Sequence, residues 1–200
     1  MHIEKELKYI LPGDWARRSL IAHFGGEAKI AVQENYYFYP QNREIGNINE
    51  MLRLRREGGS VIATYKRGRS ARDGAFVADE FEETLSSAEF AEVISGRRNL
   101  SAFDIAPVRE AKRDFGSVNF ALLGRVENER TKVRMPSGDV LELDRTSFPD
   151  GSADYELEVE TDDAEVMRGY LLDVFRRLDI DAVAQTKTKF ERFMERRKNY

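Results

Sequence analysis

One pattern along the chain constrains its fold more than any other: short segments in which apolar residues alternate with charged residues of a single sign. Successive side chains of a β-strand point to opposite faces, so each such segment would have one apolar and one charged face. Like charges on one face of a sheet repel each other, so a run of one sign needs counter-ions. The acidic sets are Glu4/Glu6, Glu80/Glu82 and Glu156/Glu158/Glu160, and the basic sets are Arg53/Arg55, Lys66, Arg130/Lys132/Arg134 and Lys187/Lys189.

This pattern predicts a chain made mostly of antiparallel strands, with helices between sets of strands. Turn residues support it, because Gly58-Gly59 and Pro136-Ser137-Gly138-Asp139 each separate two alternating runs. We expect strands at 2–9, 33–39, 51–57, 61–67, 76–85, 110–114, 119–123, 126–135, 140–144 and 153–160, and an extended segment at 184–190. Helices are expected at 14–24, from a cap at Ser86 through 94, at 163–178 and at 191–198, with a short turn near 101–103, a polar loop at 68–74 and a linker around Pro107.

The position of the charged faces decides the fold class, because a sheet of about eight strands can curl and close into a barrel whose lumen holds a ligand. Leu52, Leu54 and Leu157 lie on the opposite, apolar faces and would pack under helices. The charged faces would then line the lumen. The sequence therefore predicts an α+β protein, a closed antiparallel β-barrel of about eight strands with helices packed outside, in a single domain over residues 1–200. Charged faces that simply meet solvent are the alternative.

Composition limits the partners of such a barrel. Charged residues make up 34% of the chain, yet the formal net charge is only −4, so a polyanion would have to be met by a local basic site. The absence of cysteine excludes disulfides and thiolate metal ligands, and two histidines do not suffice for a multi-histidine zinc site. The first residues are charged and no apolar run approaches a membrane span, so we expect a cytoplasmic protein without membrane contact.

The N-terminal run Glu4-x-Glu6-x-Lys8 carries the clearest chemistry, since it places two carboxylates and an ammonium group on one face. Paired carboxylates suit a hard divalent cation such as Mg²⁺ or Mn²⁺, and the lysine beside them suits a phosphate oxygen. Acidic residues on part of a lumen and basic residues on the rest are what a metal-bound polyphosphate requires.

An ordered set of short motifs, spread over nearly the whole chain, resembles the CYTH superfamily of triphosphate tunnel metalloenzymes. The motifs are Glu4-x-Glu6-x-Lys8, Tyr37-Phe38-Tyr39-Pro40, Leu52-Arg53-Leu54-Arg55, Thr64-Tyr65-Lys66, Leu143-Asp144, Tyr155-Glu156-Leu157-Glu158 and Thr186-Lys187-Thr188-Lys189-Phe190. The resemblance implies a closed antiparallel β tunnel that binds a triphosphate and one or two divalent cations. Members of the superfamily include inorganic triphosphatases, thiamine triphosphatases, class IV adenylate cyclases and RNA 5′-triphosphatases.

The resemblance also implies roles for individual residues. The metal side would consist of Glu4, Glu6, Glu156 and Glu158. Phosphates would be held by Lys8, Arg53, Arg55, Lys66, Arg130 and Lys187 or Lys189, while Glu80, Glu82 and Asp144 would also line the tunnel. Lys8 would orient or deprotonate the nucleophile together with a tyrosine such as Tyr37, or would simply bind phosphate.

Two positions depart from the superfamily pattern. Tyr39 stands where many members have an aspartate, and Asn128 stands where they often have a lysine. The second departure leaves Arg125 and Arg134 as competitors of Arg130 for a place in the tunnel. Lys187 and Lys189 are two residues apart, so strand alternation does not choose between them.

These observations favour metal-dependent hydrolysis of a triphosphate, either inorganic tripolyphosphate or a nucleoside or thiamine triphosphate, with Mg²⁺ or Mn²⁺ as the cofactor. A class IV adenylate cyclase would use the same site to form cyclic AMP and pyrophosphate from ATP, and Tyr36, Tyr37 and Tyr39 could form its base pocket or could simply be core aromatics. A polyphosphate-binding module without turnover is a third possibility. The expected partner is a small-molecule triphosphate; the charge balance argues against nucleic acid but leaves an RNA 5′-triphosphate open. The chain would be a monomer or a homodimer.

Overall fold

The computed structural model describes residues 2–25, 30–41, 43–44 and 49–197. The strands are β1 (His2–Leu11), β2 (Ile30–Pro40), β3 (Glu50–Glu57), β4 (Ser60–Arg72), β5 (Ala75–Leu85), β6 (Phe120–Arg134), β7 (Val140–Ser147), β8 (Ala153–Glu160) and β9 (Val183–Ala184). The helices are α1 (Asp14–Phe24), α2 (Ser87–Ile94), α3 (Ala106–Phe115), α4 (Ala164–Arg177) and α5 (Lys189–Arg196), with a short 3-10 turn at Leu100–Ala102.

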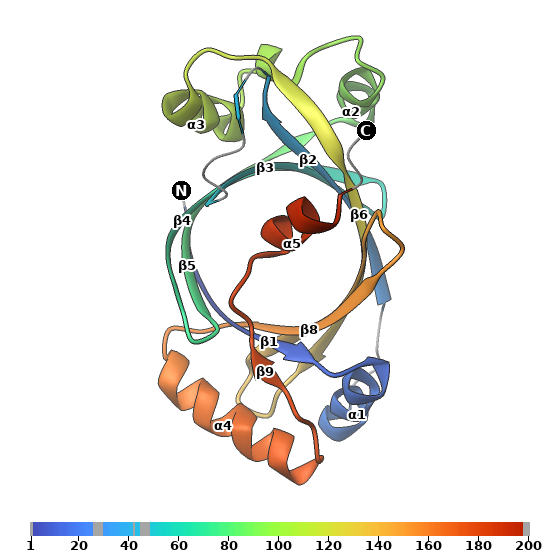
Figure 1. Cartoon of the computed structure of the whole chain (residues 1–200), viewed down its shortest axis with the longest axis vertical. Coiled ribbons are helices and arrows are strands. Elements are labelled where there is room, and N and C mark those ends of the chain that lie inside the picture. Colours follow the sequence, from blue (N-terminus) through green and yellow to red (C-terminus); the bar gives the residue numbers. More distant parts are fainter. Residues whose placement is uncertain (1, 26–29, 42, 45–48, 198–200) are drawn as a thin grey trace.

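The strands form a closed antiparallel barrel, which Figure 1 shows as a ring seen nearly end-on. Their order is β5-β4-β3-β2-β6-β7-β8-β1, with β9 added beside β1, and an additional pairing of β1 with β5 closes the ring. In that closing pair Glu4 lies opposite Ala78 and Glu6 opposite Phe76. The predicted fold class is confirmed: eight strands close on themselves and one short strand is extra.

Helices cover the barrel on two opposite sides, α2 and α3 on one and α1 and α4 on the other (Figure 1). Each side has its own apolar core. Leu52 and Leu54 of β3 are buried with Phe90 of α2, whereas Leu7 of β1 is buried with Leu171 of α4. The apolar faces of the strands therefore point outward under the helices, which leaves the charged faces for the lumen.

Local sequence signals explain several of these boundaries. α2 begins with a capping box, in which Ser86 and Glu89 satisfy each other's backbone N–H groups, as the sequence predicted. α1 ends at Gly25, which has the left-handed conformation (φ +66°) that glycine adopts at low cost.

The structure corrects the sequence prediction in four segments. The loop expected at 68–74 is mostly strand, because β4 continues to Arg72 and the turn is confined to 73–74. The linker around Pro107 and the strand expected at 110–114 are instead α3, with Pro107 in the first turn, where its missing N–H costs nothing. The strands expected at 119–123 and 126–135 are one long strand, β6. The predicted end of the last helix, at 198, lies outside the described residues, and so does part of the loop expected between the strands at 33–39 and 51–57.

The fourth correction concerns the C-terminal segment, which was expected to stay extended through Phe190. The strand β9 contains only Val183 and Ala184, and α5 already begins at Lys189, with Thr188 as its cap. α5 is also the exception to the prediction that helices lie outside, because Figure 1 shows it within the outline of the ring and its aromatic side chains pack on Tyr37 of β2. Among the described residues, no helix has the length and apolar character needed to cross a bilayer.

Candidate active site

A cavity of about 650 Å³ lies in the barrel, a size within the range of small-molecule sites. The charged faces of the strands form its walls, so the alternative in which they merely meet solvent is not what the structure shows. Among the described residues, the acidic lining is Glu4, Glu6, Glu57, Glu80, Glu82, Glu142, Glu158, Glu160 and Glu191, and the basic lining is Lys8, Arg53, Arg55, Lys66, Arg69, Arg130, Lys132 and Lys189.

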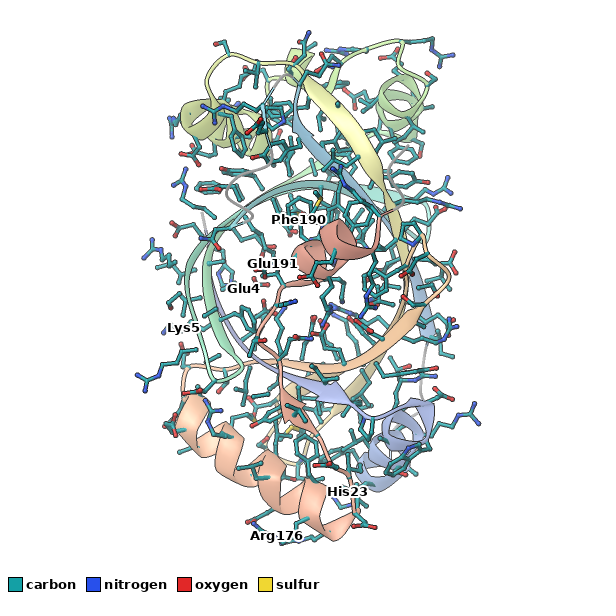
Figure 2. The ribbon with its side chains drawn as sticks, in the orientation of Figure 1. Glu4, Lys5, His23, Arg176, Phe190 and Glu191 are labelled. Atoms are coloured by element: carbon teal, nitrogen blue, oxygen red, sulfur yellow. The ribbon has the colours of Figure 1, made fainter. Side chains whose placement is uncertain are left out.

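Strand β1 builds the first acidic wall by simple alternation. Glu4 points into the barrel and the next residue, Lys5, points away from it (Figure 2). Glu4 forms an ion pair with Lys66 of β4, which also lies 3.1 Å from Glu80 of β5. Three strands therefore contribute to one partly buried cluster of two carboxylates and an ammonium group.

Lys8 is the third inward side chain of β1 and is almost completely buried. Its Nζ lies 2.8 Å from Glu6, 3.4 Å from Glu158 and 5.3 Å from the centre of the Phe76 ring. Burial alone would lower the pKa of Lys8, but the charges of Glu158 and Glu6 raise it above its ordinary value. Lys8 is thus a protonated cation here, which favours binding and orienting a phosphate over removing a proton.

Three carboxylates from β7 and β8 come within 4.8 Å of one another: Asp144, Glu156 and Glu158. Arg130 donates two hydrogen bonds to Asp144, at 2.8 and 2.6 Å, and Lys189 donates a third at 2.6 Å. Burial opposes ionisation of Asp144, but Arg130 and Lys189 lower its pKa to about 2. The cluster is therefore held together by cations from the chain itself.

Of these three carboxylates, only Glu158 belongs to the described lining of the cavity. It accepts hydrogen bonds from Arg130 at 2.8 Å and from Lys189 at 3.4 Å. Although burial would raise its pKa, Lys189, Lys8 and Arg130 lower the pKa of Glu158 well below its ordinary value. Asp144 has no exposed surface, and contrary to the prediction the structure does not place it on the lining, because Arg130 and Lys189 cover its carboxylate.

Glu156 also lies off the described lining, with 1% of its surface exposed. Arg192 of α5 donates one hydrogen bond to each of its oxygens, both at 2.8 Å, and Gln185 donates another at 3.1 Å. Burial and the charge of Glu158 raise the pKa of Glu156 to about 7, against the opposing effect of Arg192. Its two oxygens are thus engaged by the C-terminal segment and not by the cavity.

Arg53 and Arg55 of β3 differ from the other buried cations because neither forms an ion pair with an acid among the described residues. Arg53 donates to the Thr64 hydroxyl at 3.2 Å, and its Nε has no hydrogen-bond partner in the described part of the chain. Arg55 donates to Asn35 at 3.0 Å. Burial and the nearby charges of Arg53 and Arg130 lower the pKa of Arg55 to about 10. A bound anion would relieve this accumulation of positive charge.

Tyr37 lies at the edge of the cavity, but its ring is part of an aromatic core. The ring centres of Phe190 and Phe193 lie 5.1 and 4.9 Å from the centre of the Tyr37 ring, so Tyr37 packs against both aromatic side chains of α5. Its neighbours Tyr36 and Tyr39 are absent from the described lining and pack instead against Phe90 and Phe115, at 5.3 and 5.6 Å. The tyrosines considered for a base pocket are therefore mainly core residues.

The structure also accounts for the two departures from the superfamily pattern. Asn128, which replaces a frequent lysine, accepts a hydrogen bond from Thr146 at 2.8 Å and donates one to Gln33 at 3.0 Å. Gln33 in turn donates to Glu57 at 2.7 Å. A neutral hydrogen-bonded chain thus replaces a cation on this part of the barrel wall. Tyr39 belongs to the outer core, as described above, and not to the cavity.

Three predicted or competing cations lie outside the cavity. Arg134 is in phase with Arg130, but it stands at the end of β6 and donates to the carbonyl of Gly138 in the hairpin turn. Arg125 is exposed and paired with Glu34. Lys187 is exposed and lies 2.6 Å from Glu195, because the segment turns into α5 and no longer alternates like a strand. Arg130 and Lys189 therefore fill the two positions that the sequence left open.

Several lining residues were absent from the predicted set. Glu57 and Glu142 lie in phase with predicted members, so alternation could have identified them, whereas Lys132 and Glu160 were already on the predicted charged faces but had no assigned role. Arg69 lies in the segment that was expected to be a loop, and no local signal in the sequence would have placed it on the lining. Arg192, which contacts Glu156 and does not line the cavity, lies in the expected C-terminal helix, and no local signal would have revealed that contact. Both depend on how distant segments pair.

Replacement of Asp144 by asparagine should destabilise the fold by about 3–5 kcal/mol at neutral pH, because Arg130 and Lys189 would lose a buried partner. The pKa of Asp144 is about 2 when folded and 3.8 ordinarily, so its stabilising effect is complete above pH ~4 and is lost as the pH falls toward 2. Urea unfolding at a series of pH values should show the stability difference shrinking in acid. Asp173→Asn, on an exposed part of α4, is the control; a difference independent of pH would contradict the expectation.

Comparison with known proteins identifies relatives of the whole chain. The family model of the CYTH domain matches residues 2–192. HpAC1 from Hippeastrum, a candidate adenylyl cyclase described as having a dominant triphosphatase activity, is 24% identical over 96% of this chain and 95% of its own, with a TM-score of 0.85. A candidate adenylate cyclase from Bacillus halodurans is 23% identical over 96% of this chain and 99% of its own, with a TM-score of 0.75.

A third solved structure, the PH1819 protein of Pyrococcus horikoshii, is 18% identical over 98% of this chain and 100% of its own, with a TM-score of 0.64. No curated protein matches the chain. At these identities the solved structures establish the fold, while the family model covers the strands that build the cavity and the first half of α5. The chain therefore belongs to the CYTH family, whose enzymes act on small-molecule triphosphates as triphosphatases or cyclases and depend on divalent metal ions.

Proposed function

We propose that this protein is a divalent-metal-dependent triphosphatase that cleaves a terminal phosphate from a triphosphate bound in the barrel. The observation that carries the proposal is the pair Arg53 and Arg55, two guanidinium groups that line the cavity without an acidic partner among the described residues. In the ring of strands, β3 is four strands away from β8 in either direction, so these cations stand opposite Glu158. Anionic phosphates fit one wall and a cation fits the other.

The donor set of the second wall fits a hard metal ion. Glu4, Glu6 and Glu158 offer carboxylate oxygens, the ligands that Mg²⁺ and Mn²⁺ prefer. Lysines now neutralise these carboxylates: Lys66 contacts Glu4, Lys8 contacts Glu6, and Lys189 contacts Glu158. A divalent cation held by the three glutamates would supply the positive charge that offsets the phosphate chain, and the lysines would be free to turn toward phosphate oxygens.

The remaining chemistry needs positioning more than covalent help from the protein. A water oxygen bonds to the terminal phosphorus, the bridging P–O bond breaks, and one proton passes to solvent as phosphate and the shortened chain leave. Arg53, Arg55 and Arg130 would hold the equatorial oxygens, where negative charge must be stabilised in the transition state. Lys8 would orient the nucleophile or a phosphate as a cation, with its charge set by Glu158 and Glu6.

The cyclase alternative has less support in this cavity. A nucleotide cyclase needs a surface on which the base can stack, and the aromatic side chains of the described lining are Tyr37, Phe76 and Phe190. Tyr37 and Phe190 already pack against each other at 5.1 Å, and Phe76 lies beneath the ammonium group of Lys8. The dominant triphosphatase activity described for HpAC1, the similar protein from Hippeastrum, agrees with this choice.

The test measures phosphate, pyrophosphate and cyclic AMP released from tripolyphosphate, ATP and thiamine triphosphate, with Mg²⁺ or Mn²⁺. We expect metal-dependent release of phosphate, and its loss in the Glu4→Gln/Glu6→Gln double variant and in excess EDTA. The relative rates of phosphate release from the three substrates would show which class of triphosphate the enzyme prefers. Cyclic AMP with pyrophosphate from ATP would instead identify a cyclase, and binding without any product would identify a sensor; either result would overturn the proposal.

A further inference from the structure

Two of the three glutamates that alternation places on one face of β8, Glu156 and Glu158, have different surroundings. Glu158 lines the cavity and contacts Lys8, Arg130 and Lys189. Glu156 is off the lining, and both of its oxygens accept hydrogen bonds from Arg192. The two carboxylates therefore differ in role: Glu158 is presented to a ligand, and Glu156 is engaged by a contact within the chain.

Helix α5 supplies that contact and buries Phe190, Arg192 and Phe193. Phe190 and Phe193 pack on Tyr37, as described above, and Phe193 also lies against Gly124 of β6. A Cβ atom at Gly124 would come within 3.1 Å of the Phe193 ring, and the φ of +144° there is one that other residues rarely adopt. The barrel wall is thus shaped to receive this helix.

The beginning of α5 belongs to the cavity wall. Figure 2 shows Phe190 and Glu191 within the ring of strands, and both line the cavity together with Lys189. Lys189 reaches Asp144 at 2.6 Å and Glu158 at 3.4 Å. Any shift or rotation of α5 would therefore carry a cavity cation away from its place.

The Arg192–Glu156 pair is suited to fix that rotation. Arg192 is 5% exposed and Glu156 is 1% exposed, so both charges are removed from water. A buried bidentate pair tolerates little displacement, because an unpaired charge in the interior is costly. Asp154, 3.3 Å from Arg192 Nε, and Gln185, 3.1 Å from Glu156, complete the contact on either side.

We propose that Glu156 is the seat of α5, meaning the buried carboxylate that anchors the helix through Arg192, and is not a ligand of the metal. Arg192 is then a positioning residue that holds α5, and with it Lys189, in the cavity wall. The seat itself stands independently of the proposed function. Its effect on substrate rests on the proposal that the cavity binds a triphosphate.

A distance measurement tests the seat without any reference to activity. Because the chain has no cysteine, Glu195→Cys on an exposed part of α5 and Ser137→Cys in the exposed β6–β7 turn would be its only thiols. Nitroxide labels on the two should give one narrow distance distribution by pulsed electron paramagnetic resonance. We expect Arg192→Met and Glu156→Gln to broaden it, the combination to broaden it no further, and Arg176→Met, which removes an exposed ion pair of α4, to leave it unchanged.

Arg192→Lys keeps the buried charge but loses the paired donors, so it should give an intermediate distribution and serves if Arg192→Met does not fold. The inference is overturned if the distribution stays narrow in both Arg192 variants. It is also overturned if Glu156→Gln abolishes Mn²⁺ binding while the distribution stays narrow, since that would make Glu156 a metal ligand.

Tripolyphosphate affinity, measured by calorimetry with Mg²⁺ present, tests the consequence for the substrate. Arg192→Met should weaken binding at least tenfold, Arg192→Lys should restore part of the loss, and Arg176→Met should bind normally. Unchanged affinity in Arg192→Met with a broadened distance distribution would overturn the positioning role. If the unsubstituted protein binds no tripolyphosphate, the proposed function fails, and the distance measurement still decides the seat of α5.

Discussion

Replacement of Arg53 by methionine should lower kcat/KM for tripolyphosphate about 100- to 1,000-fold, the loss typical of removing a fixed donor to a developing charge. Its guanidinium is already desolvated and has no acidic partner to release within the described part of the chain, so a phosphate gains its full interaction. The same variant should be at least as stable as the parent, because a buried cation close to Arg55 disappears. Steady-state kinetics and thermal unfolding measure the two effects.

The matched control for this prediction is Arg56→Met. Arg56 lies three residues after Arg53 on the opposite face of β3, where it points outward and pairs with Glu34. It should leave kinetics unchanged. Loss of stability in Arg53→Met with normal kinetics would contradict the assignment of Arg53 to phosphate binding, because it would mean that the guanidinium supports the fold.

Replacement of Glu6 by glutamine should lower turnover by about a thousandfold, since a catalytic metal contributes several kcal/mol of transition-state stabilisation. The glutamine keeps the size of the side chain but removes the charge that faces a divalent cation. Lys8 would lose its contact at 2.8 Å and would keep Glu158 at 3.4 Å, so the fold should survive. Turnover and Mn²⁺ binding by electron paramagnetic resonance should decline together.

Glu165→Gln, at an exposed position of α4, is the control for charge removal and should bind Mn²⁺ as the parent does. Normal Mn²⁺ binding by Glu6→Gln would contradict the prediction that Glu6 of β1 is a ligand of the metal. Turnover that persists in the parent after complete removal of divalent ions would contradict the role of the metal altogether.

Alternation was sufficient to predict the lumen because strand geometry leaves little choice. Once Glu4 points inward, Glu6 and Lys8 must follow, and the same rule places Arg53 with Arg55. The barrel followed because these faces carry charge while the opposite faces are apolar. The fold and much of the lining could therefore be read from local pattern alone.

The remaining features depend on contacts between distant segments. Asp144 and Glu156 have the same phase as lining residues, and only the positions of Arg130 and Arg192 show that their carboxylates are covered. Arg134 has the correct phase but lies beyond the cavity, because the length of a strand inside a barrel is not encoded in its alternation. Lys189 could not be separated from Lys187 until the helix that begins there was known.

The position of α5 also affects how a ligand can enter and leave the cavity. Lys189, Phe190 and Glu191 of the helix line the charged cavity, and Phe193 lines a separate, smaller hollow of about 380 Å³. We expect the charged cavity to be closed where α5 lines it. A linear polyanion would enter it end first, the part at the opening would have to leave before the part held deepest, and a closed phosphate ring would present no end to admit.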